Sequence, residues 1–173
     1  MISPLPFIIT SYSIALGLTY SIVLGGMGNF NIGSYTYINS PYWMGTPPAL
    51  IKRVIIPLQL VALVGIIAWL TWLSTDPPTS GLLETTTAQI AVVSAFFIGS
   101  ILWPYFTFWR LTQKNTESLV ASIVALIVVA TSTLTGLVGT VNGPWWAIVS
   151  IVAVNVVTVF VDALGWSYAA IVG

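Results

Sequence analysis

Three polar residues near the end of the chain, Asn155, Thr158 and Asp162, are the first candidates for a chemical role. They interrupt an apolar stretch, and their spacings of three and four place them on one face of a helix. A carboxylate inside a membrane span is a functional candidate by default. Two interpretations of Asp162 stay open: it pairs with one of the Lys or Arg side chains near the membrane surface, or it contacts a ligand or an ion.

The rest of the chain offers little catalytic chemistry. It contains no His and no Cys. Their absence removes the commonest metal ligand, the usual acid–base group near neutral pH and any thiolate nucleophile. A single intramembrane carboxylate also provides no acid–base pair. We therefore expect a protein that is not an enzyme and that holds no metal or other cofactor.

The composition predicts an integral membrane protein. Of the 173 residues, 57% are hydrophobic and only 5% are charged, whereas soluble domains carry about 25% charged residues. Four Lys and Arg residues balance four Asp and Glu residues, so no basic surface is available for nucleic acid. High hydrophobicity without net charge also excludes a disordered chain.

Five stretches are long and apolar enough to cross a bilayer, which takes about 20 residues of helix. We therefore predict an all-α fold, a single domain built as a bundle of five transmembrane helices. The predicted spans cover residues 7–25, 54–73, 90–109, 119–138 and 145–164.

The positive charges predict an orientation. Lys52 and Arg53 begin the second span, and Arg110 and Lys114 follow the third. Five alternating spans place both pairs on one side of the membrane, which the positive-inside rule makes the cytoplasmic side or its equivalent. The N-terminus then lies outside and the C-terminus inside, in a membrane that the sequence does not specify.

The first span carries a stripe of small residues. Ser13, Gly17, Ser21 and Gly25 recur every four positions, so they share one helix face that another helix can approach closely. Packing within the chain is the favoured interpretation, and a homodimer through the same face is the alternative.

Two motifs resemble those of a known family. The segment Tyr37–Pro48 reads YINSPYWMGTPP, and Ile101–Phe106 reads ILWPYF. With five spans, this pattern resembles the TspO-type translocator family (tryptophan-rich sensory protein, peripheral benzodiazepine receptor). In that family an aromatic residue and a Pro-Trp pair lead into Pro-Pro and the second helix, and the third helix carries a Leu-Trp-x-Pro motif. Ser100 stands here where the family pattern has Asn.

The resemblance implies a helical bundle, often dimeric, that binds or translocates a flat apolar ligand such as a porphyrin or a sterol. On that basis Trp43, Ser100, Trp103 and Asn155 are candidate ligand-binding residues. Asp162 joins them as the intramembrane carboxylate.

A structural role is the rival hypothesis. Short loops and neutral packing faces suit a non-catalytic subunit of a larger membrane assembly, such as an organellar complex or the membrane beneath a viral capsid. A transporter or channel is disfavoured, because the spans carry few polar or ionisable residues that could line a pore.

Overall fold

The computed structural model describes residues 3–29, 41–44 and 46–172, with the backbone alone for residues 24–29 and Pro41. Every regular element in this part of the chain is a helix. In chain order these are α1 (Leu5–Asn29), the 3-10 turn η2 (Pro41–Trp43), α2 (Pro48–Leu50), the π-turn η3 (Ile51–Ile55), α3 (Ile56–Thr75), α4 (Thr86–Gln113), α5 (Thr116–Thr140), α6 (Trp145–Asn155), the π-helix η4 (Val156–Trp166) and α7 (Ser167–Val172).

These elements form five continuous rods. The shorter helices join end to end, so that α2, η3 and α3 make one rod and α6, η4 and α7 make another. Each of the five rods is long and apolar enough to cross a membrane: Leu5–Val23, Pro48–Thr75, Thr86–Gln113, Thr116–Thr140 and Trp145–Val172. The predicted all-α bundle of five apolar helices is confirmed, and it fits a multi-pass membrane protein.

Local sequence explains where several rods begin and bend. The side chain of Thr85 accepts a hydrogen bond from the Ala88 N–H at the start of α4, and Asn115 starts α5 in the same way. Pro57 has no N–H and its ring crowds the carbonyl four residues before it. The preceding turn widens accordingly into η3, where the Ile56 N–H bonds to the Ile51 carbonyl.

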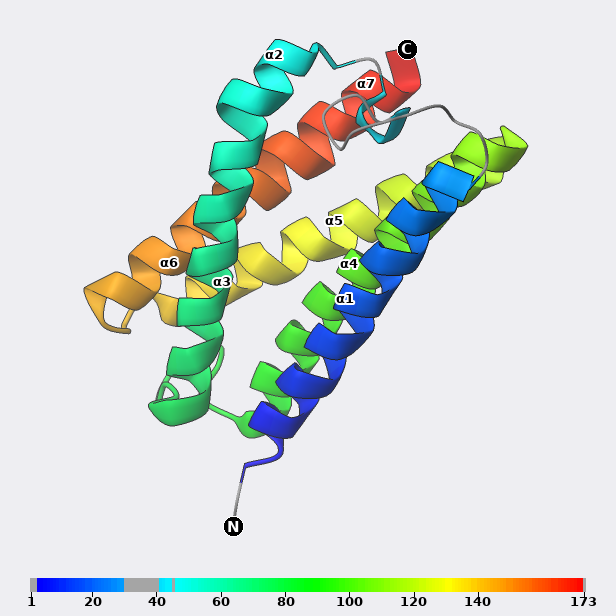
Figure 1. Cartoon of the computed structure of the whole chain (residues 1–173). Coiled ribbons are helices and arrows are strands. Elements are labelled where there is room, and N and C mark those ends of the chain that lie inside the picture. Colours follow the sequence, from blue (N-terminus) through cyan, green and yellow to red (C-terminus); the bar gives the residue numbers. More distant parts are fainter. Residues whose placement is uncertain (1–2, 30–40, 45, 173) are drawn as a thin grey trace.

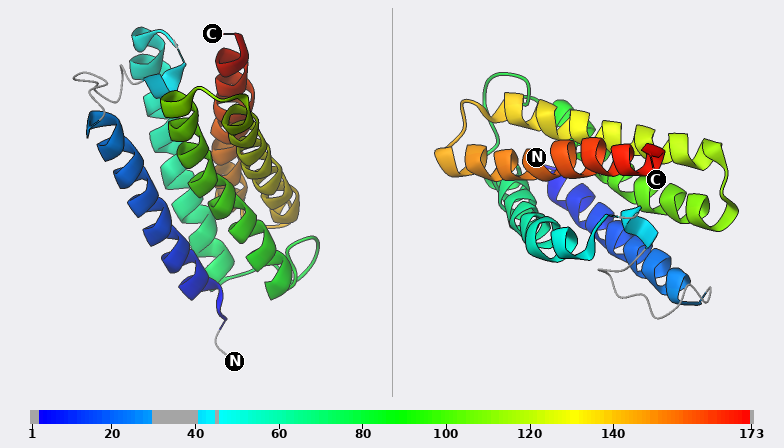
Figure 2. Two further views of the ribbon diagram at one scale, coloured as in Figure 1. Left: turned by 90° about the vertical axis from the view of Figure 1, so that its right-hand side faces the viewer. Right: turned by 90° about the horizontal axis from the view of Figure 1, so that it is seen from above.

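The rods alternate in direction (Figure 1). Helix α4 runs antiparallel to α5, α3 lies beside α6, and α1 lies along α4 at the edge of the bundle. Figure 2 shows α2 and the α4–α5 connection at one end of the bundle, opposite the N-terminus and the α3–α4 loop. The two segments that carry the cations therefore share an end, as alternating spans require.

Two glycines set the closest helix contacts. A Cβ atom built on Gly65 of α3 would lie 2.6 Å from the Ser150 carbonyl oxygen of α6. One built on Gly99 of α4 would lie 2.9 Å from the Ala125 carbonyl oxygen of α5. Only glycine permits backbones to approach this closely, as in other membrane helix pairs.

The predicted small-residue stripe does not pack in this way. Ser13, Gly17 and Ser21 are exposed on α1, and a Cβ atom on Gly17 would meet nothing within 4 Å. The Ser21 hydroxyl donates back to the Gly17 carbonyl of its own helix. Among the described residues, close packing is thus absent at Gly17, because α1 lies along α4 through a different face. Gly25 lies where only the backbone of α1 is described.

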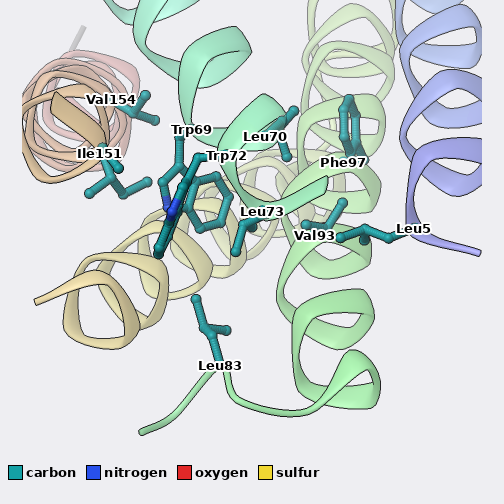
Figure 3. Packing of buried hydrophobic residues seen from close by; sticks show 11 residues of the cluster. Leu5, Trp69, Leu70, Trp72, Leu73, Leu83, Val93, Phe97, Ile151 and Val154 are labelled. Carbon is teal, nitrogen blue, oxygen red and sulfur yellow. The ribbon is translucent and has the colours of Figure 1, made fainter. Parts of the chain in front are cut away.

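The buried apolar side chains form two main clusters. The larger, which we call the outer cluster, lies toward the α3–α4 loop and includes Trp69, Trp72 and Leu83 (Figure 3). The second, the inner cluster, lies toward the cationic end and groups Tyr42, Trp103, Trp166 and Leu126. The indole N–H of Trp166 also donates to the Tyr42 carbonyl oxygen at 2.8 Å, which joins the last rod to the turn before α2.

The predicted orientation is testable with single cysteines, since the natural chain has none. We expect Thr79→Cys, in the exposed α3–α4 loop, and Gln113→Cys, at the exposed end of α4, to react with a membrane-impermeant maleimide from opposite sides. Gln113 is preferred to Asn115, whose side chain caps α5. Labelling of both positions from one side of sealed vesicles would contradict the five-span topology.

The glycine contacts predict a contrast in stability. Gly65→Ala forces its new methyl group against the Ser150 backbone, and we expect a loss of about 1–3 kcal/mol, as for other overpacked cores. Gly17→Ala meets open space and should leave stability unchanged or slightly raised. Unfolding in mixed micelles, followed by circular dichroism, measures both. Equal effects of the two variants would contradict the assigned contacts.

Candidate functional site

A cavity of about 560 Å³ lies within the bundle. All five rods contribute side chains to its wall, which is mostly apolar. Leu70, Phe97 and Val154 of the outer cluster line it, and so do Trp103 and Leu126 of the inner cluster. The cavity therefore occupies the space between the two clusters, where the packing of the bundle is interrupted.

The cavity opens between α1 and α3. Its lining residues on these two helices include Ser13 and Gly17, which are exposed, and Leu63 and Ile67, whose side chains are 54% and 57% exposed. In a bilayer such exposed apolar side chains face lipid. An apolar molecule could thus enter from the membrane without passing through water.

The wall is mostly apolar toward one end and more polar toward the other. Leu70 and Phe96 line the part nearer the α3–α4 loop, whereas Gln59, Trp103 and Asp162 line the part nearer the cationic end. On α4, Trp103 follows Phe96 by seven residues, which is about 10 Å along a helix axis. A bound molecule would therefore find most of its polar contacts nearer the cationic end.

Asp162 is half-buried in the wall, on the π-helix η4. Within the described residues, which include all four Lys and Arg side chains, its carboxylate forms no ion pair or hydrogen bond. The expected pairing with a nearby cation is therefore not found. π-Helical segments are uncommon and often occur at functional sites, and the position of Asp162 matches that tendency.

Trp103 is buried at the polar end, with 6% of its surface exposed. Its ring lies 5.1 Å from that of Tyr42 and 5.7 Å from that of Trp166, both nearly edge to face. Its indole N–H has no hydrogen-bond partner among the described residues. Buried indole N–H groups usually have one, so this donor is an exception, and the nitrogen itself is enclosed by protein atoms.

Asn155, unlike Asp162, has its polar atoms hydrogen-bonded within the protein. Its amide donates to the carbonyls of Thr133 and Ile151 at 3.0 and 2.9 Å, and it accepts from the Thr133 hydroxyl at 3.2 Å. Thr158, which lines the cavity, also hydrogen-bonds to Thr133 at 2.9 Å. Sequence spacing correctly places these residues on one face, but that face joins α5, and Asn155 is not in the cavity wall.

The remaining candidates divide between cavity and core. Ser100 lines the cavity. Trp43 is buried against Ile51 and Ile55, outside the cavity wall. Gln59 also lines the cavity, and the sequence analysis did not single it out. A polar amide within the second predicted span was the feature that could have identified it.

Comparison of the chain with protein-family models, with curated proteins and with solved structures finds no match. The fold and the cavity thus define a class only: a multi-pass bundle with an apolar cavity that opens sideways. The resemblance to TspO-type translocators remains a hypothesis based on two short motifs.

The hydrogen bonds of Asn155 predict a structural rather than a ligand-binding role. Asn155→Leu removes its contacts to α5, and we expect a loss of about 1–2 kcal/mol in unfolding free energy, since such bonds contribute about 0.6 kcal/mol each on average. Thr131→Val, on an exposed face of α5, is the matched control and should have little effect. Unchanged stability of Asn155→Leu would contradict this assignment.

Proposed function

We propose that this protein is an integral membrane protein that binds a flat apolar ligand, taken up from the bilayer between α1 and α3. A porphyrin or a sterol is the ligand class that the resemblance to TspO-type translocators implies. The observation that carries the proposal is the cavity of about 560 Å³, which opens toward lipid and has an apolar wall with polar groups at one end.

The size and lining of the cavity support this function. Cavities of about 300–1,000 Å³ accommodate drug-sized ligands, and most have apolar and aromatic walls with a few polar groups that orient the ligand. Phe96, Phe97 and Trp103 supply aromatic surface. A rigid flat molecule suits such a wall, because it loses little conformational freedom on binding.

The second candidate function is a structural subunit of a larger membrane assembly. The exposed stripe on α1 favours it, because Ser13, Gly17 and Ser21 are not packed against any other helix that the structure describes. A partner helix, from a second copy or from another protein, could approach there closely. The same stripe borders the cavity mouth, so binding and assembly would compete for it.

A plug at the cavity mouth tests the binding proposal. Titration with an uncharged porphyrin should quench tryptophan fluorescence saturably in the natural protein. Gly17→Phe places a ring at the mouth, where a Cβ atom meets nothing within 4 Å, and we expect it to weaken binding by about tenfold or more, equivalent to about 1.4 kcal/mol or more.

Leu18→Phe is the matched control, because Leu18 is exposed on the same helix but does not line the cavity. It should bind as the natural protein does. Equal quenching of both variants would place the ligand elsewhere. No saturable quenching at all, together with stoichiometric partners after extraction in mild detergent, would favour the structural subunit.

A further inference from the structure

We propose that the ligand of this cavity carries a positive charge, as an ammonium group on a flat apolar body, and that Asp162 receives that charge. This inference rests on the proposed function and adds the chemistry of the ligand's polar group. The juxtaposition that carries it is a carboxylate without a cation beside the aromatic wall of a cavity that opens to lipid.

The first argument is the missing counter-charge. An ionised carboxylate in apolar surroundings is stable only when it is paired or hydrogen-bonded. All four cations of the chain lie in the described residues, and none pairs with Asp162. Lys52, Arg53 and Lys114 are exposed, and Arg110 is half-buried. A cation bound in the cavity would supply the counter-charge that these side chains do not provide.

The second argument is the aromatic wall near Asp162. Trp166 follows Asp162 by four residues, about one helical turn, and its ring lies 5.7 Å from that of Trp103. Trp103 and Asp162 are thus near the same level of the cavity, and both line it. Aromatic faces attract cations, most strongly in tryptophan. An ammonium group at this level would meet a carboxylate and an indole ring together.

The charge of the wall also separates the expected ligands. The polar end carries one acidic side chain and no basic one, so a ligand with carboxylate groups at this end would be repelled. An uncharged hydroxyl is the closer rival, because it can donate a hydrogen bond to the Asp162 carboxylate. The charge decides between them: a hydrogen bond between two ionised groups is stronger than one to a neutral donor.

A series of sterols with one ring system and different groups at carbon 3 tests this inference. The protein in micelles is titrated with the 3-ammonium, 3-hydroxyl and 3-sulfate forms, each displacing a fluorescent sterol. We expect the ammonium form to bind about tenfold more tightly than the hydroxyl form, because a hydrogen bond between charged groups is stronger than one to a neutral group. The sulfate form should bind most weakly.

Asp162→Asn keeps the shape and removes the charge, so it should abolish the preference for ammonium, whereas Asp162→Glu should retain it. Asp76→Asn, which removes an acidic group from the exposed loop, is the control and should behave as the natural protein does. If a variant does not fold, the relative affinities of the three sterols for the natural protein still test the inference.

The outcomes separate the two proposals. Equal binding of the three sterols, or a preference for the hydroxyl or sulfate form, would overturn the charge inference and leave the proposed function intact. A preference for ammonium that persists in Asp162→Asn would assign the charge recognition to another part of the protein and likewise overturn it. Failure of every sterol and of the uncharged porphyrin to bind would overturn both.

Discussion

The close approach of helix backbones at Gly65 and Gly99 is the constraint on which the rest of the structure depends. These contacts fix α3 against α6 and α4 against α5, with glycine where any side chain would intrude. Helix α1 has no such contact at Gly17 and lies at the edge of the bundle, along α4. Two tightly joined pairs and one peripheral helix leave space between α1 and α3, and the cavity occupies that space.

The polar residues of the spans divide according to whether the protein satisfies them. Trp69 donates to Thr140 across the α3–α5 contact, Gln89 donates to the Leu83 carbonyl, and Asn155 is held by Thr133. Inside a membrane such groups must find partners within the protein. Asp162 and Trp103 are exceptions, because the carboxylate and the buried indole N–H have no partner among the described residues, and both residues line the cavity. Their position there, rather than their polarity alone, distinguishes a binding role from a structural one.

Much of the fold followed from the sequence, and part of the site did not. Apolar stretches of sufficient length predicted the five helices, because lipid demands internally hydrogen-bonded segments. The stripe from Ser13 to Gly25 predicted close packing that the structure lacks at Gly17, whereas Gly65 and Gly99 provide it without any repeated spacing. Spacing also grouped Asn155 with Asp162, although only Asp162 reaches the cavity. Helix periodicity predicts which residues share a face of a helix. Which helix or cavity that face contacts depends on tertiary contacts between segments far apart in the sequence.

The hydrogen bond from Trp166 to the Tyr42 carbonyl has a consequence for biosynthesis. The two residues are 124 positions apart, so the turn before α2 leaves the ribosome long before its partner in the last rod exists. Chains elongate at about 5–20 residues per second, and during those seconds the cationic end of the nascent bundle lacks this closure. The polar end of the cavity is therefore completed only when the final rod has been inserted.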